Sequence, residues 1–260
     1  MSCFNEYNRL IFGETIGWLG EKRVVKELTR EEYQILLSLL THRKTRLRWS
    51  AAERLGKLGN GHAVEALIKA LQDTHWLVRL HAAKALGRIG DPIAIEPLVK
   101  MMGDECPYVR RCVVISLVQL NGGGNMRITE VLISGLTDSD KVVRASAAWG
   151  LGDTASQPAV TAVAAVVSDC DSNVSWRAIE ALQRIGTPAV KTLIELLDCP
   201  DSEVRYRAVK TLGEVGAQLA VKPLKKMLDD PIEKVSWRAK LALQQIERRA
   251  SWEKSTSRVM

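Results

Sequence analysis

One motif recurs along the sequence at a nearly constant spacing. A clear copy reads VRLHAAKALGRIGD from Val78 to Asp91, and six other segments repeat its frame. Aligning the residue that follows the leading Leu or Val gives positions 48, 79, 110, 144, 175, 205 and 236. The mean spacing is about 31 residues, within the 20–50-residue period that is typical of stacked repeats. The sequence therefore predicts a row of similar units.

Each unit is expected to contain two antiparallel helices. Its second half has apolar residues at helical spacing, as at Val78, Ala82, Leu86 and Ile89, and usually ends at a glycine that can close a helix. The first half is also amphipathic, as in AVEALIKAL and AVKPLKKML. The turn between the halves contains an aspartate that can cap the second helix, namely Asp73, Asp104, Asp138, Asp171, Asp201 or Asp230. The predicted fold class is all-α, an α-solenoid of about seven helix pairs.

The repeat frame also predicts the domain boundaries. The solenoid is expected to span residues 30–249, and residues 1–29 are expected to form a degenerate N-terminal capping segment, which a solenoid needs at its exposed end. A longer spacing between the third and fourth units coincides with the glycine-rich segment 121–125, which we predict to be a flexible elbow. Residues 250–260 are predicted to form a polar tail.

Composition narrows the class of protein. The longest uncharged stretch is shorter than the roughly 20 apolar residues needed to span a bilayer, and the N-terminus lacks the pattern of a secretory signal. Five cysteines without a CxxC pair do not favour a disulfide framework or a zinc ribbon. These features predict a cytoplasmic protein. A net charge of +7 favours acidic partners.

The helix pair, with its acidic turn, Val-Arg start and Ala-Ala-x-x-Leu-Gly core, resembles HEAT repeats. More narrowly, residues 30–249 resemble the short HEAT-like units of phycobilisome lyases. This resemblance implies either an E/F-type bilin lyase subunit or a related factor that removes bilin during phycobilisome degradation. It also implies phycobiliprotein subunits as partners, a phycocyanobilin-like bilin as ligand, and a second HEAT-repeat subunit. Such repeats occur on many scaffolds, so the implied fold is more specific than the implied function.

Arginine begins the repeated motif in five units. These residues are Arg48, Arg79, Arg110, Arg144 and Arg205. Stacking of the units would align them as a ladder along the solenoid. We expect each ladder arginine to pair with turn carboxylates of its own or a neighbouring unit.

Large aromatic and basic side chains follow the ladder position and form a predicted aromatic-basic stripe. In HEAT-like proteins the second helices form the concave surface that commonly binds partners. Trp, Tyr and Arg are enriched in interface hot spots, and Arg binds carboxylates with a planar fork. Packing between units, or a solvated charged face, are the alternatives left open. The predicted binding residues are Trp49, Arg111, Trp149, Trp176, Arg177, Tyr206, Arg207, Trp237 and Arg238.

No catalytic motif accompanies the repeats, and the catalytic residues stay unknown at this stage. The sequence has no HExxH, P-loop, GxGxxG or GxSxG motif, its four histidines form no metal-binding pairs, and no cofactor is expected to be required. One hypothesis is a protein that binds phycobiliproteins, bilin or both in chromophore attachment or removal. The alternative is a non-catalytic scaffold that binds an acidic partner in the concave groove. The acidic turns and the modest charge excess do not favour nucleic acid.

Overall fold

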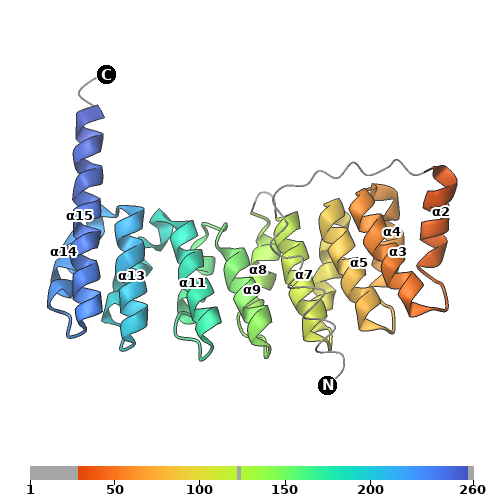
Figure 1. Ribbon diagram of the computed structural model, residues 1–260, viewed down its shortest axis with the longest axis horizontal. Coiled ribbons are helices and arrows are strands. Elements are labelled where there is room, and N and C mark those ends of the chain that lie inside the picture. The colour runs from red at the N-terminus through yellow and green to blue at the C-terminus, as the bar shows by residue number, and fades with distance from the viewer. Residues whose placement is uncertain (1–28, 122–123, 257–260) are drawn as a thin grey trace.

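The structure is a computed structural model that describes residues 29–121 and 124–256. Across these ranges the protein has 14 α-helices and no strand. Figure 1 shows the helices side by side in one elongated row. The helices form seven consecutive pairs, which confirms the all-α solenoid predicted from the sequence. Among the helices described, none is both long and apolar enough to cross a membrane.

Each unit contributes a first and a second helix. The first helices are α2 (Arg30–Leu39), α4 (Val64–Ala70), α6 (Ile95–Lys100), α8 (Met126–Gly135), α10 (Gln157–Ala165), α12 (Val190–Glu195) and α14 (Val221–Lys226). The second helices are α3 (Thr45–Leu58), α5 (Trp76–Ile89), α7 (Pro107–Leu120), α9 (Lys141–Leu151), α11 (Ser172–Ile185), α13 (Ser202–Val215) and α15 (Glu233–Thr256). Short 3-10 helices flank the shorter first helices: η1 (Gly61–Ala63), η2 (Pro92–Ala94), η3 (Met101–Gly103), η4 (Thr187–Ala189), η5 (Leu196–Asp198), η6 (Gln218–Ala220) and η7 (Met227–Asp229).

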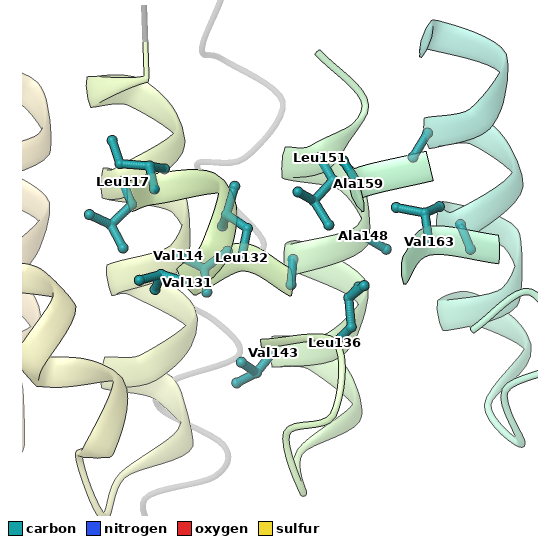
Figure 2. Close-up of a cluster of buried hydrophobic side chains, with 14 of the residues drawn as sticks. Val114, Leu117, Val131, Leu132, Leu136, Val143, Ala148, Leu151, Ala159 and Val163 are labelled. Atoms are coloured by element: carbon teal, nitrogen blue, oxygen red, sulfur yellow. The ribbon is translucent and has the colours of Figure 1, made fainter. Parts of the chain in front are cut away.

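The core is a continuous band of aliphatic side chains that runs along the array. Leu55, Leu86, Leu117 and Leu151 occupy the same place in four successive second helices, and all four are fully buried. Figure 2 shows the central part of the band, where side chains from α7, α8, α9 and α10 meet. Burial of one leucine contributes about 1.5–3 kcal/mol. Stacking therefore gives each helix pair the buried area that it lacks alone.

Glycines allow neighbouring second helices to approach closely. A Cβ atom added to Gly56 of α3 would lie 2.6 Å from the Cα of Ala85 in α5. A Cβ added to Gly87 of α5 would lie 2.6 Å from the Cβ of Ser116 in α7. Contacts this short leave no room for a side chain at either position. The glycine of the Leu-Gly element is therefore needed for these helices to stack.

A ladder of arginine–aspartate pairs runs along the edge where the two helices of each unit are joined, the lower edge in Figure 1. Each ladder arginine donates bidentate hydrogen bonds to an aspartate in the turn of the following unit. The pairs are Arg48–Asp73, Arg79–Asp104, Arg110–Asp138, Arg144–Asp169 and Arg205–Asp230, with Nε–O distances of 2.6–2.8 Å. The predicted pairing with turn carboxylates is confirmed, and the partner belongs to the neighbouring unit.

The turn aspartates have two different roles. Asp171 and Asp201 are N-caps, and their side chains accept hydrogen bonds from the backbone of α11 and α13. The ladder aspartates instead bind arginine. The hydrogen bond from Arg144 lowers the pKa of Asp169 below its usual value, against an opposing effect of burial, so this carboxylate stays charged near neutral pH. The sequence suggested capping for all turn aspartates, but four of the six proposed caps are ladder residues: Asp73, Asp104, Asp138 and Asp230.

The junction between α11 and α13 has neither an arginine–aspartate ladder pair nor a close-approach glycine. Ser175 stands at the ladder position of α11, and Cys199 stands where the next turn carries aspartate in the other units. The Ser175 hydroxyl donates instead to the carbonyl of Val167 at 2.5 Å. Gln183 replaces the close-approach glycine, and its amide donates to Glu214 across the junction at 2.6 Å. Side-chain hydrogen bonding thus joins these two units without a ladder pair.

The ends of the array are only partly described. Residues 1–28 of the predicted capping segment lie outside the described residues, and Thr29 caps α2 by accepting a hydrogen bond from the backbone of Glu32. At the other end α15 continues through Thr256, into the segment 250–260 that was predicted as a polar tail. Lys240 of α15 is exposed at a position where the preceding units bury Ala, Val or Ile, which is the polar outer face typical of a terminal repeat.

The segment predicted as an elbow, 121–125, begins and ends with asparagines that organise the backbone. The Asn121 side chain accepts a hydrogen bond from the backbone of Asn125 at 2.8 Å. The Asn125 side chain in turn accepts from Arg127 and Ile128 and caps α8. Residues 122 and 123 lie outside the described residues.

Candidate binding face

The second helices line one face of the array, which we call the second-helix face. On each second helix, the residue after the ladder position and the residues four and eight positions further on lie one helical turn apart and form a column. In α3 this column consists of Trp49, Glu53 and Lys57. Equivalent columns on the other second helices, with the residues that border them, contain the aromatic-basic stripe predicted from the sequence.

Two tryptophans of the stripe are solvent-exposed in the C-terminal half of this face. Trp176 of α11 is 44% exposed and Trp237 of α15 is 58% exposed. Tyr206 of α13, between them in the repeat order, is half-buried, and the Nζ of Lys234 lies 4.2 Å from its ring centroid. Exposed tryptophans provide large rigid surfaces for contact with a partner.

Two other stripe tryptophans contact the neighbouring unit. The ring of Trp49 stacks on His81 of α5 with a centroid separation of 5.0 Å. The guanidinium carbon of Arg184 in α11 lies 5.1 Å from the ring of Trp149, and Arg184 donates to the Trp149 carbonyl at 2.8 Å. These contacts match the alternative of packing between units. The stripe thus contains side chains in two environments.

The three arginines that follow the stripe aromatics all have glutamate partners. The pairs are Arg177–Glu180, Arg207–Glu203 and Arg238–Glu214, with N–O distances of 2.8, 3.0 and 3.5 Å. Arg177 also lies over the Trp176 ring, with 4.5 Å between its guanidinium carbon and the ring centroid. Glu203 also pairs with Lys234, and Glu214 also contacts Lys210, so the cations outnumber these carboxylates, while the rings of Trp176 and Trp237 stay exposed.

The N-terminal half of the face is also rich in cations. Its columns on α3, α5 and α7 contain four cations and one carboxylate, that of Glu53, which forms an ion pair with Lys57 at 2.8 Å. Arg111, a stripe residue, belongs to this group and its buried Nε has no hydrogen-bond partner. We call this group the cationic cluster, and its members are Lys57, Lys84, Arg88 and Arg111.

Two uncharged groups lie among these cations. Burial lowers the pKa of His81 to about 4, with Glu53 opposing this effect and the neighbouring cations adding to it, so the imidazole is neutral near pH 7. Burial likewise raises the pKa of the Cys112 thiol to about 11, although nearby Lys84, Arg111 and Arg88 favour the thiolate. The Cys112 thiol donates to the Leu80 carbonyl at 3.5 Å. A protonated, buried thiol is a poor nucleophile.

Most of the chain matches a known family of repeats. The model of HEAT repeats matches residues 33–118, 129–198 and 190–255, which together are most of the chain. The chain belongs to the HEAT-repeat family. No curated protein matches this HEAT-repeat protein.

Several solved structures share the fold. The complex of CpcE and CpcF of phycocyanin lyase from Nostoc sp. PCC7120 is 22% identical with a TM-score of 0.53, and the alignment covers 88% of this HEAT-repeat protein and 98% of that chain. YibA of E. coli is 19% identical with a TM-score of 0.53, covering 88% and 100%. An engineered protein is 25% identical with a TM-score of 0.50, covering 83% and 68%. These similarities show a shared solenoid architecture.

The second-helix face of this HEAT-repeat protein is suited to binding. Among the residues that the structure describes, no three His, Cys, Asp or Glu side chains are grouped as a metal site. Of the cationic cluster, only Arg111 was among the binding residues predicted from the sequence, and Lys57, Lys84 and Arg88 were not. The sequence did contain a pattern that indicates these residues, because Lys57 and Arg88 occupy the same column position in consecutive units. The predicted stripe residues themselves stay a prediction.

Proposed function

We propose that this HEAT-repeat protein binds a phycobiliprotein subunit on its second-helix face and acts in the attachment or removal of bilin. The observation that carries the proposal is the composition of that face, which combines the cationic cluster with the exposed rings of Trp176 and Trp237. Phycobiliproteins are acidic as a class, so the cations complement them. The shared fold with the CpcE and CpcF complex supports the choice of partner.

In this proposal the protein contributes binding and orientation. A solenoid that holds an open-chain bilin beside its acceptor converts an encounter into an oriented reaction. The protonated thiol of the half-buried Cys112 is a poor nucleophile, and in this proposal a cysteine of the phycobiliprotein accepts the bilin. A second HEAT-repeat subunit, as in the CpcE and CpcF complex, would add the remainder of the binding surface.

Binding of apo-phycocyanin α-subunit, followed by isothermal titration calorimetry, tests the proposal. We expect saturable binding, weakened about 30-fold when Trp176→Ala and Trp237→Ala are combined, because interface hot spots contribute about 2 kcal/mol or more. Leu219→Ala is the matched control, since Leu219 is 75% exposed but lies in η6, outside the second helices. Its affinity should equal that of the wild type. Absence of binding to both apo- and bilin-loaded subunits contradicts the proposal.

A scaffold that binds another acidic protein is the second candidate. The cationic cluster supports it as well, because charge complementarity does not depend on a pigment. The two candidates differ in their response to phycocyanobilin. A saturable shift in the bilin absorbance favours the phycobiliprotein function, whereas an unchanged spectrum together with no phycocyanin binding favours the scaffold.

A further inference from the structure

The junction between α11 and α13 is bridged differently from the other junctions between neighbouring second helices. In the described part of the chain, each of the other five junctions has a ladder pair. Here Ser175 takes the place of the arginine and donates to Val167 of its own unit. Cys199 takes the place of the aspartate, and its Sγ lies 3.8 Å from the Oγ of Ser168. A contact between uncharged groups therefore replaces a bidentate, charge-assisted one.

The close-approach position also differs at this junction. In four other units it holds a buried glycine, and these residues are Gly56, Gly87, Gly152 and Gly213. Val118 holds it in α7, where room is provided by Gly150 of α9, because a Cβ added to Gly150 would collide with Val118. In α11 it holds Gln183, which is exposed and reaches Glu214 of α13. A long side chain at this position keeps the helix axes further apart than glycine does.

The contacts that remain at this junction restrain its angle weakly. The hydrogen bond from Gln183 to Glu214 is exposed, so water competes for both groups. The next ladder pair is buried by comparison, with the side chains of Arg205 and Asp230 only 12% and 3% exposed. Apolar side chains on both sides belong to the continuous core band. Apolar packing is not directional, so it holds the two units together without fixing their angle.

We infer that the junction between α11 and α13 is a hinge, about which the units up to α11 and the two units from α12 to α15 move as two blocks. The hinge lies between Trp176 of α11 and the two aromatic side chains that follow it, Tyr206 of α13 and Trp237 of α15 (Figure 1). Its angle therefore sets the distance between the two exposed tryptophans. A partner that contacts both rings selects one hinge angle. This consequence rests on the proposed function, whereas the hinge itself does not.

Double electron–electron resonance between pairs of spin labels tests the hinge in the full-length protein. The labels are attached to p-acetylphenylalanine, which leaves the five cysteines of the chain unchanged. One pair is placed at Thr161 of α10 and Lys222 of α14, two junctions apart with the hinge between them. The matched control pair is placed at Gln34 of α2 and Glu96 of α6, which span two junctions with ladder pairs. All four residues are exposed, and each lies two positions before a buried core residue of its helix.

We expect the distance distribution of the Thr161–Lys222 pair to be about twice as wide as that of the control pair, because hinge motion adds to the motion of the labels. Ser175→Arg combined with Cys199→Asp restores the ladder pair and should narrow this distribution to the control width. Ser175→Arg alone lacks the aspartate and should leave it wide. Circular dichroism establishes that both variants are folded.

Equal widths for the two pairs in the otherwise unchanged protein would contradict the hinge. A wide distribution that the double substitution leaves unchanged would contradict the missing ladder pair as its cause. The partner is absent from this measurement, so the result does not depend on the proposed function. A wide distribution in a protein that fails to bind phycocyanin supports the hinge and contradicts the choice of partner.

Discussion

Asp104→Asn is expected to lower the free energy of unfolding by about 3 kcal/mol, the low end of the range measured when a buried ion pair loses one partner. Asp104 accepts hydrogen bonds from Nε and Nη2 of Arg79 at 2.7 and 3.0 Å. The side chains of Arg79 and Asp104 are only 10% and 4% exposed. The substitution removes the buried anionic partner of Arg79 at the junction between two units and leaves only the exposed carboxylate of Glu105 beside it.

The adjacent residue provides an internal control. Glu105 also contacts Arg79, at 3.3 Å from Nη2, but its side chain is 86% exposed. Glu105→Gln should therefore change the free energy of unfolding by less than about 0.5 kcal/mol, as for other exposed ion pairs. Urea denaturation followed by circular dichroism measures both variants. Similar losses in the two variants would show that burial does not set the strength of the ladder pairs.

Gly87→Ala is expected to destabilise the protein by about 1–3 kcal/mol, the usual effect of overpacking. In an ordinary helix interior the same change stabilises by about 0.5–1 kcal/mol, so the predicted sign is reversed. The reason is the 2.6 Å separation between the added Cβ and the Cβ of Ser116, with the Ser116 Cα at 2.7 Å. Helices α5 and α7 would have to move apart, which would also loosen the ladder pair between Arg79 of α5 and Asp104 in the turn before α7.

Gly103→Ala is the control for this prediction. Gly103 ends η3, its backbone has no positive φ, and a Cβ there would meet nothing within 4 Å. This variant should be as stable as the wild type or slightly more stable, because alanine restricts the unfolded chain. A melting temperature of Gly87→Ala equal to or above that of Gly103→Ala would contradict the close approach of α5 and α7.

The repeat pattern was sufficient to predict the fold because most units have the same residues at the positions where neighbouring units meet. A ladder arginine, a turn aspartate and a close-approach glycine recur at fixed positions, and each has a direct counterpart in the contacts between units. The junction between α11 and α13 could not be predicted in this way. Ser175, Cys199 and Gln183 each break the pattern at a different position, and only the structure shows that they meet at one junction.

The charge balance of the second-helix face was only partly accessible from the sequence. Arg177–Glu180 and Arg207–Glu203 are pairs three and four residues apart on one helix, so helical spacing alone would have predicted them. Arg238 pairs with Glu214 of another unit, and that contact depends on how α13 and α15 stack. The raised pKa of Cys112 and the lowered pKa of His81 likewise depend on how α3, α5 and α7 stack, because the partners of these side chains lie on neighbouring units.

Hydrogen–deuterium exchange of the protein with and without phycocyanin tests the central claim most directly. The claim is that the second-helix face binds the partner. We expect slower amide exchange on binding in α3, α5 and α7 and in α11, α13 and α15, with little change in the first helices. Unchanged exchange throughout, or protection confined to first helices such as α4, α6 and α14, would contradict it.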